Sequence, residues 1–165
     1  DVDDYRRSGY DRGHLAPAAD MKWSKRAMQQ SFYFSNVSPQ IGNFNGGLWR
    51  ELEEHVREVA RRHERLLVIT GPVLQPGLKR IGKQTRVSIP RAYYKVLLDT
   101  QPPEIEAVGY LVPAYQQQKT PKDFVVPIDS IERLTGLDFL PQLPDDAENA
   151  LESHVYEAHW RARLQ

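Results

Sequence analysis

The feature that most limits the fold of this chain is a series of short, strand-like runs, each divided from the next by proline or glycine. The runs are rich in β-branched, aromatic and aliphatic side chains. They cover residues 65–70, 86–89, 92–98, 105–112 and 123–126, and an aromatic run over residues 31–37 predicts one more strand. Because short strands interrupted in this way pair most readily with their neighbours in the chain, the sequence predicts a mainly antiparallel sheet.

One long amphipathic helix is expected from about residue 46 to residue 63, with Asn45 at its N-cap. Glutamates and arginines fill most of its surface. Its apolar positions recur at helical spacing, and they are Leu48, Leu52, Val56 and Val59. Residues 1–10 are polar and irregular, and residues 38–47 carry turn-forming side chains throughout, so both segments are expected to be loops.

Shorter helices are predicted around the strands. One covers residues 21–30, and another runs from Asp129, which can form a capping box with Glu132, to about residue 136. A last helix opens at residues 144–146 and extends toward Trp160. Together these elements predict an α+β fold, a mainly antiparallel sheet with packed helices, in a single domain over residues 1–165.

The composition excludes several classes of protein. The 165 residues contain no cysteine, which removes disulfides, thiolate metal ligands and a cysteine nucleophile together. No apolar run is long enough for a transmembrane helix, so no membrane partner is expected. With 22 basic and 22 acidic residues the chain is neutral. Neutrality argues against a wholly basic nucleic-acid-binding surface, unless cations gather locally.

Among the five histidines, His14 has the surroundings of a reactive group. His55, His63, His154 and His159 fall in predicted helices among charged neighbours, where an exposed histidine is the ordinary expectation. His14 instead follows a glycine, stands beside a carboxylate and a guanidinium, and precedes a segment that cannot continue a helix. The sequence therefore predicts an imidazole held at the end of a strand.

A second set of polar side chains follows the long helix at intervals of four residues: Asn45, Trp49, Glu53 and Arg57. Taken alone, these residues could be an N-cap, a core tryptophan and an ordinary glutamate–arginine pair. They could also supply oxygen ligands to Mg²⁺, which keeps most of its waters, with an arginine beside the ion for a phosphate. Trp49 is assigned to packing rather than to base stacking.

Three strings in this order resemble the DNA/RNA non-specific endonuclease family, which has the ββα-metal (His-Me) finger. They are Asp11-Arg12-Gly13-His14, Asn36-Val37-Ser38-Pro39-Gln40, and residues 45–53 from Asn45 to Glu53 with Arg57 beyond. The resemblance extends over residues 69–74, 87–90, 94–96 and 126–136, and so covers nearly the whole chain.

The resemblance implies a role for each of these residues. His14 would be the general base that takes a proton from the attacking water, and Asn36 would orient it. Asn45 would be the direct ligand of one Mg²⁺, with Mn²⁺ as a substitute ion, and Glu53 would hold metal-bound waters. Arg12 and Arg57 would neutralise charge on the phosphoryl oxygens.

The resemblance also implies the reaction and the partners. The expected activity is hydrolysis of DNA and RNA to 5′-phosphate and 3′-hydroxyl ends. Neutral overall charge is compatible with this if a local group of cations lies around His14, comprising Arg6, Arg7, Arg12, Lys25 and Arg26. A protein inhibitor and a homodimer are further expected partners. An exported enzyme is favoured, with a mitochondrial one as the alternative.

Two alternative functions remain open at this point. A nucleic-acid-binding or inhibitor-binding module could keep the scaffold without turnover, although it would have no need of His14, Asn45 and Glu53 together. A phosphodiesterase for small nucleotides would need a closed pocket, which nothing in the sequence marks. Family members carry a strand and a further phosphate-contacting arginine ahead of the Asp-Arg-Gly-His string. Here only ten residues precede it, so three explanations stay open: that segment is trimmed, Arg6 or Arg7 replaces it, or the sheet is left with an unprotected edge.

Overall fold

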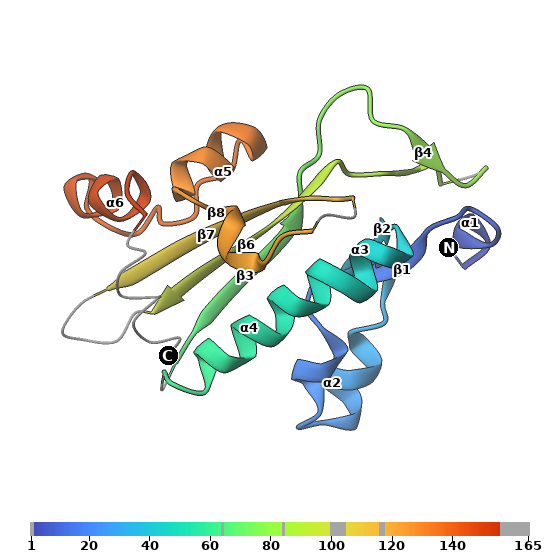
Figure 1. Ribbon diagram of the computed structural model, residues 1–165, viewed down its shortest axis with the longest axis horizontal. Helices are drawn as coiled ribbons and strands as arrows, with labels where there is room; N and C mark the ends of the chain where they lie inside the picture. Colours follow the sequence, from blue (N-terminus) through green and yellow to red (C-terminus); the bar gives the residue numbers. More distant parts are fainter. Residues whose placement is uncertain (1, 64, 84, 100–104, 116–117, 156–165) are drawn as a thin grey trace.

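The computed structural model describes residues 2–63, 65–83, 85–99, 105–115 and 118–155, which form a sheet with helices on both faces (Figure 1). Its central sheet has four antiparallel strands in the order β3-β6-β7-β8, which are Leu67–Pro72, Ala92–Asp99, Glu106–Pro113 and Val125–Val126. Two antiparallel ribbons accompany it: β1 (Asp11–His14) with β2 (Val37–Gln40), and β4 (Arg80–Ile81) with β5 (Val87–Ser88). The predicted α+β class and antiparallel pairing are confirmed.

The helices are mostly short, and α4 is the longest of those described. The α-helices are α1 (Val2–Tyr5), α2 (Lys25–Gln30), α3 (Gly42–Phe44), α4 (Arg50–Ala60), α5 (Ile128–Thr135) and α6 (Asp145–Glu152). Shorter turns of helix are η1 (Ala18–Met21), η2 (Phe34–Asn36), the wider η3 (Asn45–Trp49) and η4 (Pro121–Phe124). No helix of the described residues is long and apolar enough to cross a membrane.

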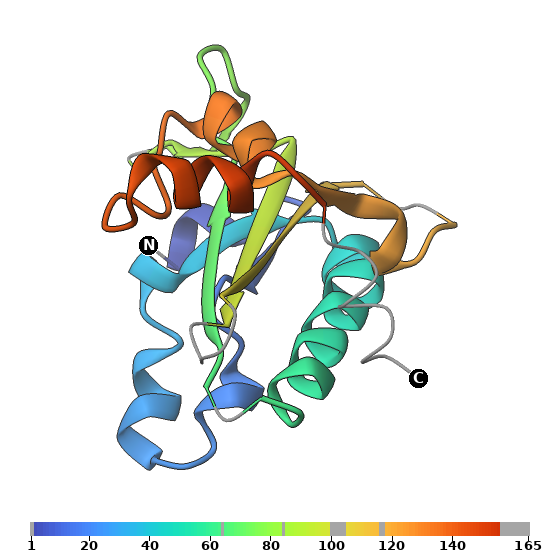
Figure 2. The same cartoon turned by 90° about the vertical axis from the view of Figure 1, so that its left-hand side faces the viewer.

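Strand β6 divides the core into two layers. Tyr93 and Leu97 pack with α4 on one face, whereas Tyr94 and Leu98 pack with α5 on the other. Alternate side chains of a strand point to opposite faces, and both faces of this strand are covered, so β6 is apolar along most of its length. Figure 2 shows α4 on one side of the sheet and α5 and α6 on the other. Lys95, a charged side chain in the middle of this strand, is 1% exposed.

The β1–β2 ribbon and the helix after it form the strand–strand–helix order that the family resemblance implies. His14 ends β1 opposite Val37, and the chain leaves β2 directly into α3, η3 and α4. The Tyr93 hydroxyl donates a hydrogen bond to the Pro39 carbonyl at 2.7 Å and lies 2.9 Å from the Ser38 hydroxyl. These buried contacts join the ribbon to the central sheet, so β1 and α4 are held in a fixed relation.

The expected strand over residues 31–37 is wrong for all but its last residue. Residues 31–36 form turns and η2, with Phe32, Tyr33 and Phe34 exposed, and β2 begins only at Val37. The physical reason is that the segment bonds to itself: the Asn36 amide donates to the Ser31 carbonyl at 2.8 Å. An aromatic composition favours a strand only where a neighbouring strand is available to pair with it.

The expected loop over residues 38–47 is also wrong. Residues 38–40 complete β2, where Pro39 is tolerated because the ribbon has only two strands. The helix begins at Gly42 with Ile41 at its N-cap, so Asn45 is not a cap: its φ and ψ of −58° and −49° are helical. The buried ring of Phe44 fixes this early turn to the core, and the helix passes through the glycine pair as a wider turn.

Three further helix expectations have mixed outcomes. Helix α5 forms and Gly136 closes it in the left-handed conformation, φ 70°, as expected. The capping box at Asp129 does not form, because Pro127 is the N-cap; a capping box is found instead in η4, between Thr120 and Asp123. Helix α6 follows Pro144 as predicted, although its extension toward Trp160 lies outside the described residues. Residues 1–10, expected to be irregular, contain α1.

Gly13 is required by close packing rather than by its backbone angles. A Cβ atom at Gly13 would overlap the side chain of Gln40, which is itself fully buried and cannot swing aside. We expect Gly13→Ala to lower the free energy of unfolding by about 1–3 kcal/mol, as overpacking does elsewhere. The measurement is urea unfolding followed by circular dichroism.

Gly46→Ala is the matched control, since a Cβ at Gly46 meets nothing within 4 Å. An alanine in this helix should leave stability unchanged or raise it by up to about 1 kcal/mol. Equal stabilities for the two variants would show that Gln40 yields and that Gly13 is not needed for packing.

Candidate active site

His14 lies at the end of β1 in a partly buried position. The edge of the Phe32 ring meets it at 4.7 Å between centroids and 87° between planes. Burial, assisted by the charge of Arg12, lowers the pKa of His14 below its usual 6.5, so the imidazole is neutral at neutral pH. Its Nε2 atom is buried and has no hydrogen-bond partner. A purely structural histidine seldom leaves a buried nitrogen unpaired, so this ring is arranged as a reactive group would be.

Asn36 supports the segment after His14 rather than the imidazole itself. Its amide oxygen accepts from the Ala16 nitrogen at 2.9 Å, and its amide nitrogen donates to the Ala16 carbonyl at 2.8 Å. The Asn36 carbonyl also accepts from the Leu15 nitrogen at 3.0 Å. Any influence of Asn36 on His14 therefore acts through the backbone of Leu15 and Ala16.

Trp49 joins the helix to the end of β1. It is 1% exposed, packs against Phe44 and Tyr93, and donates a hydrogen bond from Nε1 to the His14 carbonyl at 3.3 Å. The interpretation of Trp49 as a packing residue is confirmed. Because the indole bonds the backbone of His14, it also sets the distance between the imidazole and the polar face of the helix.

Asn45 stands on that face one turn before Trp49. Its amide nitrogen donates to Asp11 Oδ2 at 3.1 Å. This bond fixes the orientation of the amide, and the oxygen is then the atom that Asn45 can offer to a cation. Asp11, interpreted from the sequence as a structural residue, thus orients a site residue across 34 positions of sequence.

Glu53 lies one further turn along and shares a pocket with the other candidates. His14, Asn45, Glu53 and Arg57 all line this open hollow of about 380 Å³ between the helix and the segment after β1. Burial raises the pKa of Glu53, and the charges of Lys95 and Arg57 oppose that rise. The pocket therefore combines an imidazole, an amide, a carboxylate with a raised pKa and a guanidinium.

The two arginines occupy different positions. Arg57 pairs with Asp20 at 3.2 Å and not with Glu53, so the simple pair within the helix that the sequence allowed does not form. Arg12 is exposed on β1 and is not among the residues lining the pocket. Of the five cations expected around His14, Arg12 is the one whose charge affects the pKa of the imidazole. Arg6 instead pairs with Asp3 at 3.4 Å.

Lys95 is the site residue that sequence reasoning missed. Its ammonium group donates to Thr70 Oγ1 at 3.0 Å and to the Leu15 carbonyl at 3.4 Å, and it lies 4.7 Å from the centre of the Trp49 ring. Burial lowers the pKa of Lys95, while the charge of Glu53 raises it. The available signal was a single charged residue inside the otherwise apolar run of residues 92–98.

We expect Lys95→Met to raise the pKa of Glu53 further. The positive charges of Lys95 and Arg57 oppose the effect of burial on Glu53. Removing the charge of Lys95 leaves only that of Arg57, so Glu53 keeps its proton to higher pH. The measurement is a carbon NMR titration of the glutamate carboxyl groups, with the Glu53 signal assigned by its loss in Glu53→Gln. Lys119→Met, at a lysine near Phe124, is the control and should leave the titration unchanged. A lower or unaltered Glu53 pKa in Lys95→Met would contradict the assignment.

Two of the remaining histidines are not the exposed side chains that the sequence suggested. His55 lies 3.0 Å from the Tyr110 hydroxyl, and burial lowers its pKa. His63 Nδ1 is hydrogen-bonded to the Asp99 carboxylate. His154 is exposed as expected and lies 2.7 Å from the Ser153 hydroxyl, whereas His159 is outside the described residues.

A β-ribbon followed by a helix, with an imidazole at the strand end and an amide and a carboxylate on the helix, defines the class of ββα-metal nucleases. Comparison with known proteins agrees. The family model for DNA/RNA non-specific endonuclease matches residues 1–146. The chain belongs to the DNA/RNA non-specific endonuclease family.

Several relatives are similar over most of this chain. Mitochondrial endonuclease G of Bos taurus is 40% identical over 152 residues, which is 85% of this chain and 51% of that protein. The mitochondrial nuclease of Saccharomyces cerevisiae is 35% identical over 172 residues, 92% of this chain and 52% of that protein. The crystal structure of an EndoG/EndoGI complex superimposes with a TM-score of 0.81 at 33% identity, covering 87% of this chain and 64% of that one. The chain thus spans about half the length of the curated relatives it matches.

Proposed function

We propose that this chain is a Mg²⁺-dependent endonuclease that hydrolyses DNA and RNA. The observation that carries the proposal is the shared pocket of His14, Asn45, Glu53 and Arg57 on a ββα unit. A nucleic-acid-binding module would need neither a neutral imidazole nor an oriented amide oxygen beside it. A small-nucleotide phosphodiesterase is disfavoured because the pocket is open, and a closed one is expected around a small ligand.

The donor set fits a hard cation. Asn45 offers an amide oxygen held in place by Asp11, and Glu53 offers a carboxylate about two turns further along the helix. Oxygen donors of this kind favour Mg²⁺, with Mn²⁺ as a substitute, over softer metals. In this assignment Asn45 would hold the ion directly and Glu53 would accept hydrogen bonds from its waters. When bound, the ion would stabilise negative charge on the phosphate and on the departing 3′ oxygen.

His14 removes the proton from the attacking water in this proposal. The lowered pKa supports the assignment, because a base must be unprotonated before it can act and His14 is neutral at neutral pH. Asn36 acts as a positioning residue through the backbone after His14. Breaking the bond between the phosphorus and the 3′ oxygen leaves 5′-phosphate and 3′-hydroxyl ends.

Arg12 and Arg57 bind the phosphate in this proposal, and the two differ in what binding requires. To bind a phosphate, Arg57 must either keep its ion pair with Asp20 and use its remaining N–H groups or break that pair. Arg12 is already exposed to solvent. Contacts to phosphate carry no information about base or sugar, which agrees with a substrate range that includes both DNA and RNA.

The relatives also inform the partners and the location. Their names place them in mitochondria, so we favour the mitochondrial alternative, and these names give the exported location no support. The EndoG/EndoGI complex supports a protein inhibitor as a second partner of this chain. A homodimer stays a prediction from family resemblance.

The test is digestion of plasmid DNA and of total RNA by the purified chain, with Mg²⁺ and with EDTA. Degradation of both polymers in Mg²⁺ alone, with 5′-phosphate ends on the products, would support the proposal. If DNA shifts on a gel in Mg²⁺ but is never cut, the chain is a binding module instead. Identical digestion in EDTA would overturn the role of the metal.

A further inference from the structure

A group of five carboxylates lies where α5 packs against α6, away from the pocket described above. Asp129 and Glu132 stand on α5, Glu148 and Glu152 on α6, and Asp138 on the segment between the two helices. Carboxylate oxygens of Asp129, Glu132 and Glu152 lie within 4.8 Å of one another, and so do those of Asp138, Glu148 and Glu152. We name these five residues the α5–α6 acidic cluster, with Glu152 common to both halves.

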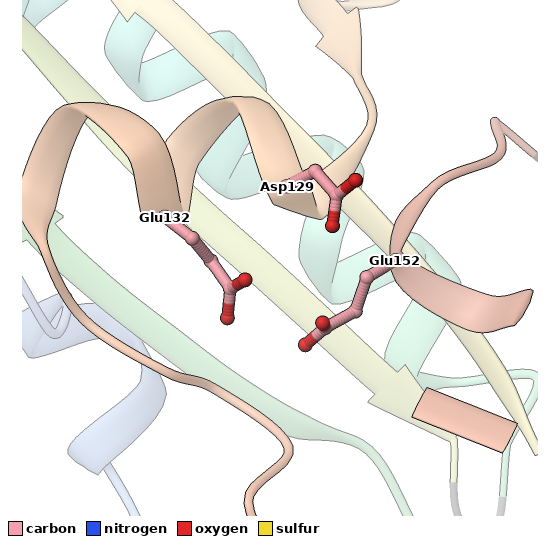
Figure 3. A group of neighbouring side chains, drawn as sticks. All are labelled: Asp129, Glu132 and Glu152. Carbon is pink, nitrogen blue, oxygen red and sulfur yellow. The ribbon is translucent and has the colours of Figure 1, made fainter. Parts of the chain in front are cut away.

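Figure 3 shows how the first of these groups is arranged. The side chains of Asp129, Glu132 and Glu152 come from two different helices, and their carboxylates converge on the space between those helices. Carboxylates that repel one another would be expected to turn outward to water where they can. Convergence therefore calls for something positive, or a proton, between them.

Glu152 provides an independent observation. The residue is only 5% exposed, and its Oε1 atom is buried with no hydrogen-bond partner. Burying a carboxylate oxygen without a partner is costly, and buried charges are normally paired or bound to metals. Within the described residues, the ion pair found in this cluster joins Arg133 to Asp129 at 3.8 Å and does not reach Glu152.

The electrostatics agree with this geometry. Burial, the charges of Glu132 and Glu148 and a hydrogen bond shared with the Glu132 carboxyl group raise the pKa of Glu152 to about 8. In contrast, Glu132 is partly satisfied, since its Oε1 accepts a hydrogen bond from the Phe139 nitrogen at 2.8 Å. The buried oxygen of Glu152 is thus the point in the cluster at which a cation would relieve the most unfavourable interactions.

We propose that the α5–α6 acidic cluster is a calcium-binding site that joins α6 to α5. Ca²⁺ accepts six to eight oxygen ligands in flexible geometry, whereas Mg²⁺ requires a near-ideal octahedron and is usually held by one or two carboxylates. Three carboxylates around one point, with two more adjacent, match the first ion better. The site lies on the sheet face opposite α4, so it is separate from the Mg²⁺ position proposed at Asn45 (Figure 2).

The first measurement is the melting temperature of the metal-stripped chain in EDTA, in Ca²⁺ and in Mg²⁺, with calorimetric titration of Ca²⁺. We expect Ca²⁺ to raise the melting temperature more than Mg²⁺ does, because ligand binding to the folded state alone stabilises it. Glu152→Gln keeps the shape of the side chain but removes its charge. It should abolish the calcium-dependent rise and weaken Ca²⁺ binding at least about tenfold.

Two control variants separate this site from the rest of the chain. Glu51→Gln changes an exposed acid on α4 and should keep the full calcium effect. Asn45→Ala alters the proposed Mg²⁺ ligand and should also keep it. Asp138→Asn, at an exposed member of the cluster, gives a second reading if Glu152→Gln does not fold.

Three results would overturn the proposal. They are the absence of Ca²⁺ binding by the wild-type chain, which would mean that protons alone relieve the cluster; an equal rise with Mg²⁺; and a calcium effect that survives in both Glu152→Gln and Asp138→Asn. None of these measurements depends on nuclease activity, so failure here and failure of the proposed function are distinguishable.

Discussion

His14→Ala should reduce the rate of DNA cleavage at saturating Mg²⁺ by about 10²- to 10⁴-fold, the usual contribution of a general base. The substitution removes the group proposed to accept the proton from water and leaves the proposed metal ligand and phosphate contacts in place. Mg²⁺ binding and DNA affinity should therefore change little. The measurement is the initial cleavage rate of a labelled duplex, together with a gel-shift titration of the same duplex in Mg²⁺.

The pH dependence of the wild-type rate gives a second test of the same assignment. A base works only when unprotonated, so the rate should rise as pH increases through the pKa of His14, which lies below 6.5, and then level off. Arg12→Gln removes a charge that lowers this pKa, and it should shift the rising limb to higher pH.

His154→Ala is the matched control for the first prediction, because that histidine is exposed and lies beside Ser153 on the C-terminal side of α6. It should cleave at the wild-type rate. A His14→Ala enzyme that keeps most of its rate would remove His14 from the role of base. A loss of cleavage with an equal loss of DNA affinity would make it a binding residue instead.

Asn45→Ala should raise the Mg²⁺ concentration for half-maximal cleavage by at least about 10- to 100-fold. Losing a residue that merely supports a metal ligand commonly costs that much affinity, and here the proposed ligand itself is lost. Asn45→Asp keeps an oxygen donor at the same position and should restore much of the Mg²⁺ affinity. The measurement is the initial rate as a function of free Mg²⁺ for the wild type and both variants.

Asn43→Ala supplies the comparison within the same helix, since Asn43 is an exposed asparagine two residues away. Its Mg²⁺ dependence should match that of the wild type. Asp11→Ala should give an intermediate effect, because it releases the Asn45 amide without removing the oxygen. An Mg²⁺ titration that is unaltered by Asn45→Ala would exclude this residue from the metal site.

The sequence predicted the elements that depend on local pattern. The apolar spacing of residues 48–59 predicted the helix that contains α4, and the β-branched runs predicted the strands of the central sheet. Both patterns could be identified because the period of burial depends only on residues that are near one another in the sequence. Elements that depend on distant partners were predicted less well. The aromatic run over residues 31–36 had the composition of a strand but no strand to pair with, and Asn45 had the character of an N-cap but lies inside a helix that begins at Gly42.

The candidate site divides in the same way. His14 and the four-residue spacing of Asn45, Glu53 and Arg57 could be identified from the sequence, since a strand end and a helix face follow from local order. Only the tertiary structure brought the charge of Lys95 close enough to affect the pKa of Glu53, paired Arg57 with Asp20 and directed Asn36 to the backbone after His14. Protonation states depend on burial and on charges contributed by separate segments. The sequence by itself therefore determined which residues are candidates for the chemistry, and the fold decided their partners and the direction in which their pKa values shift.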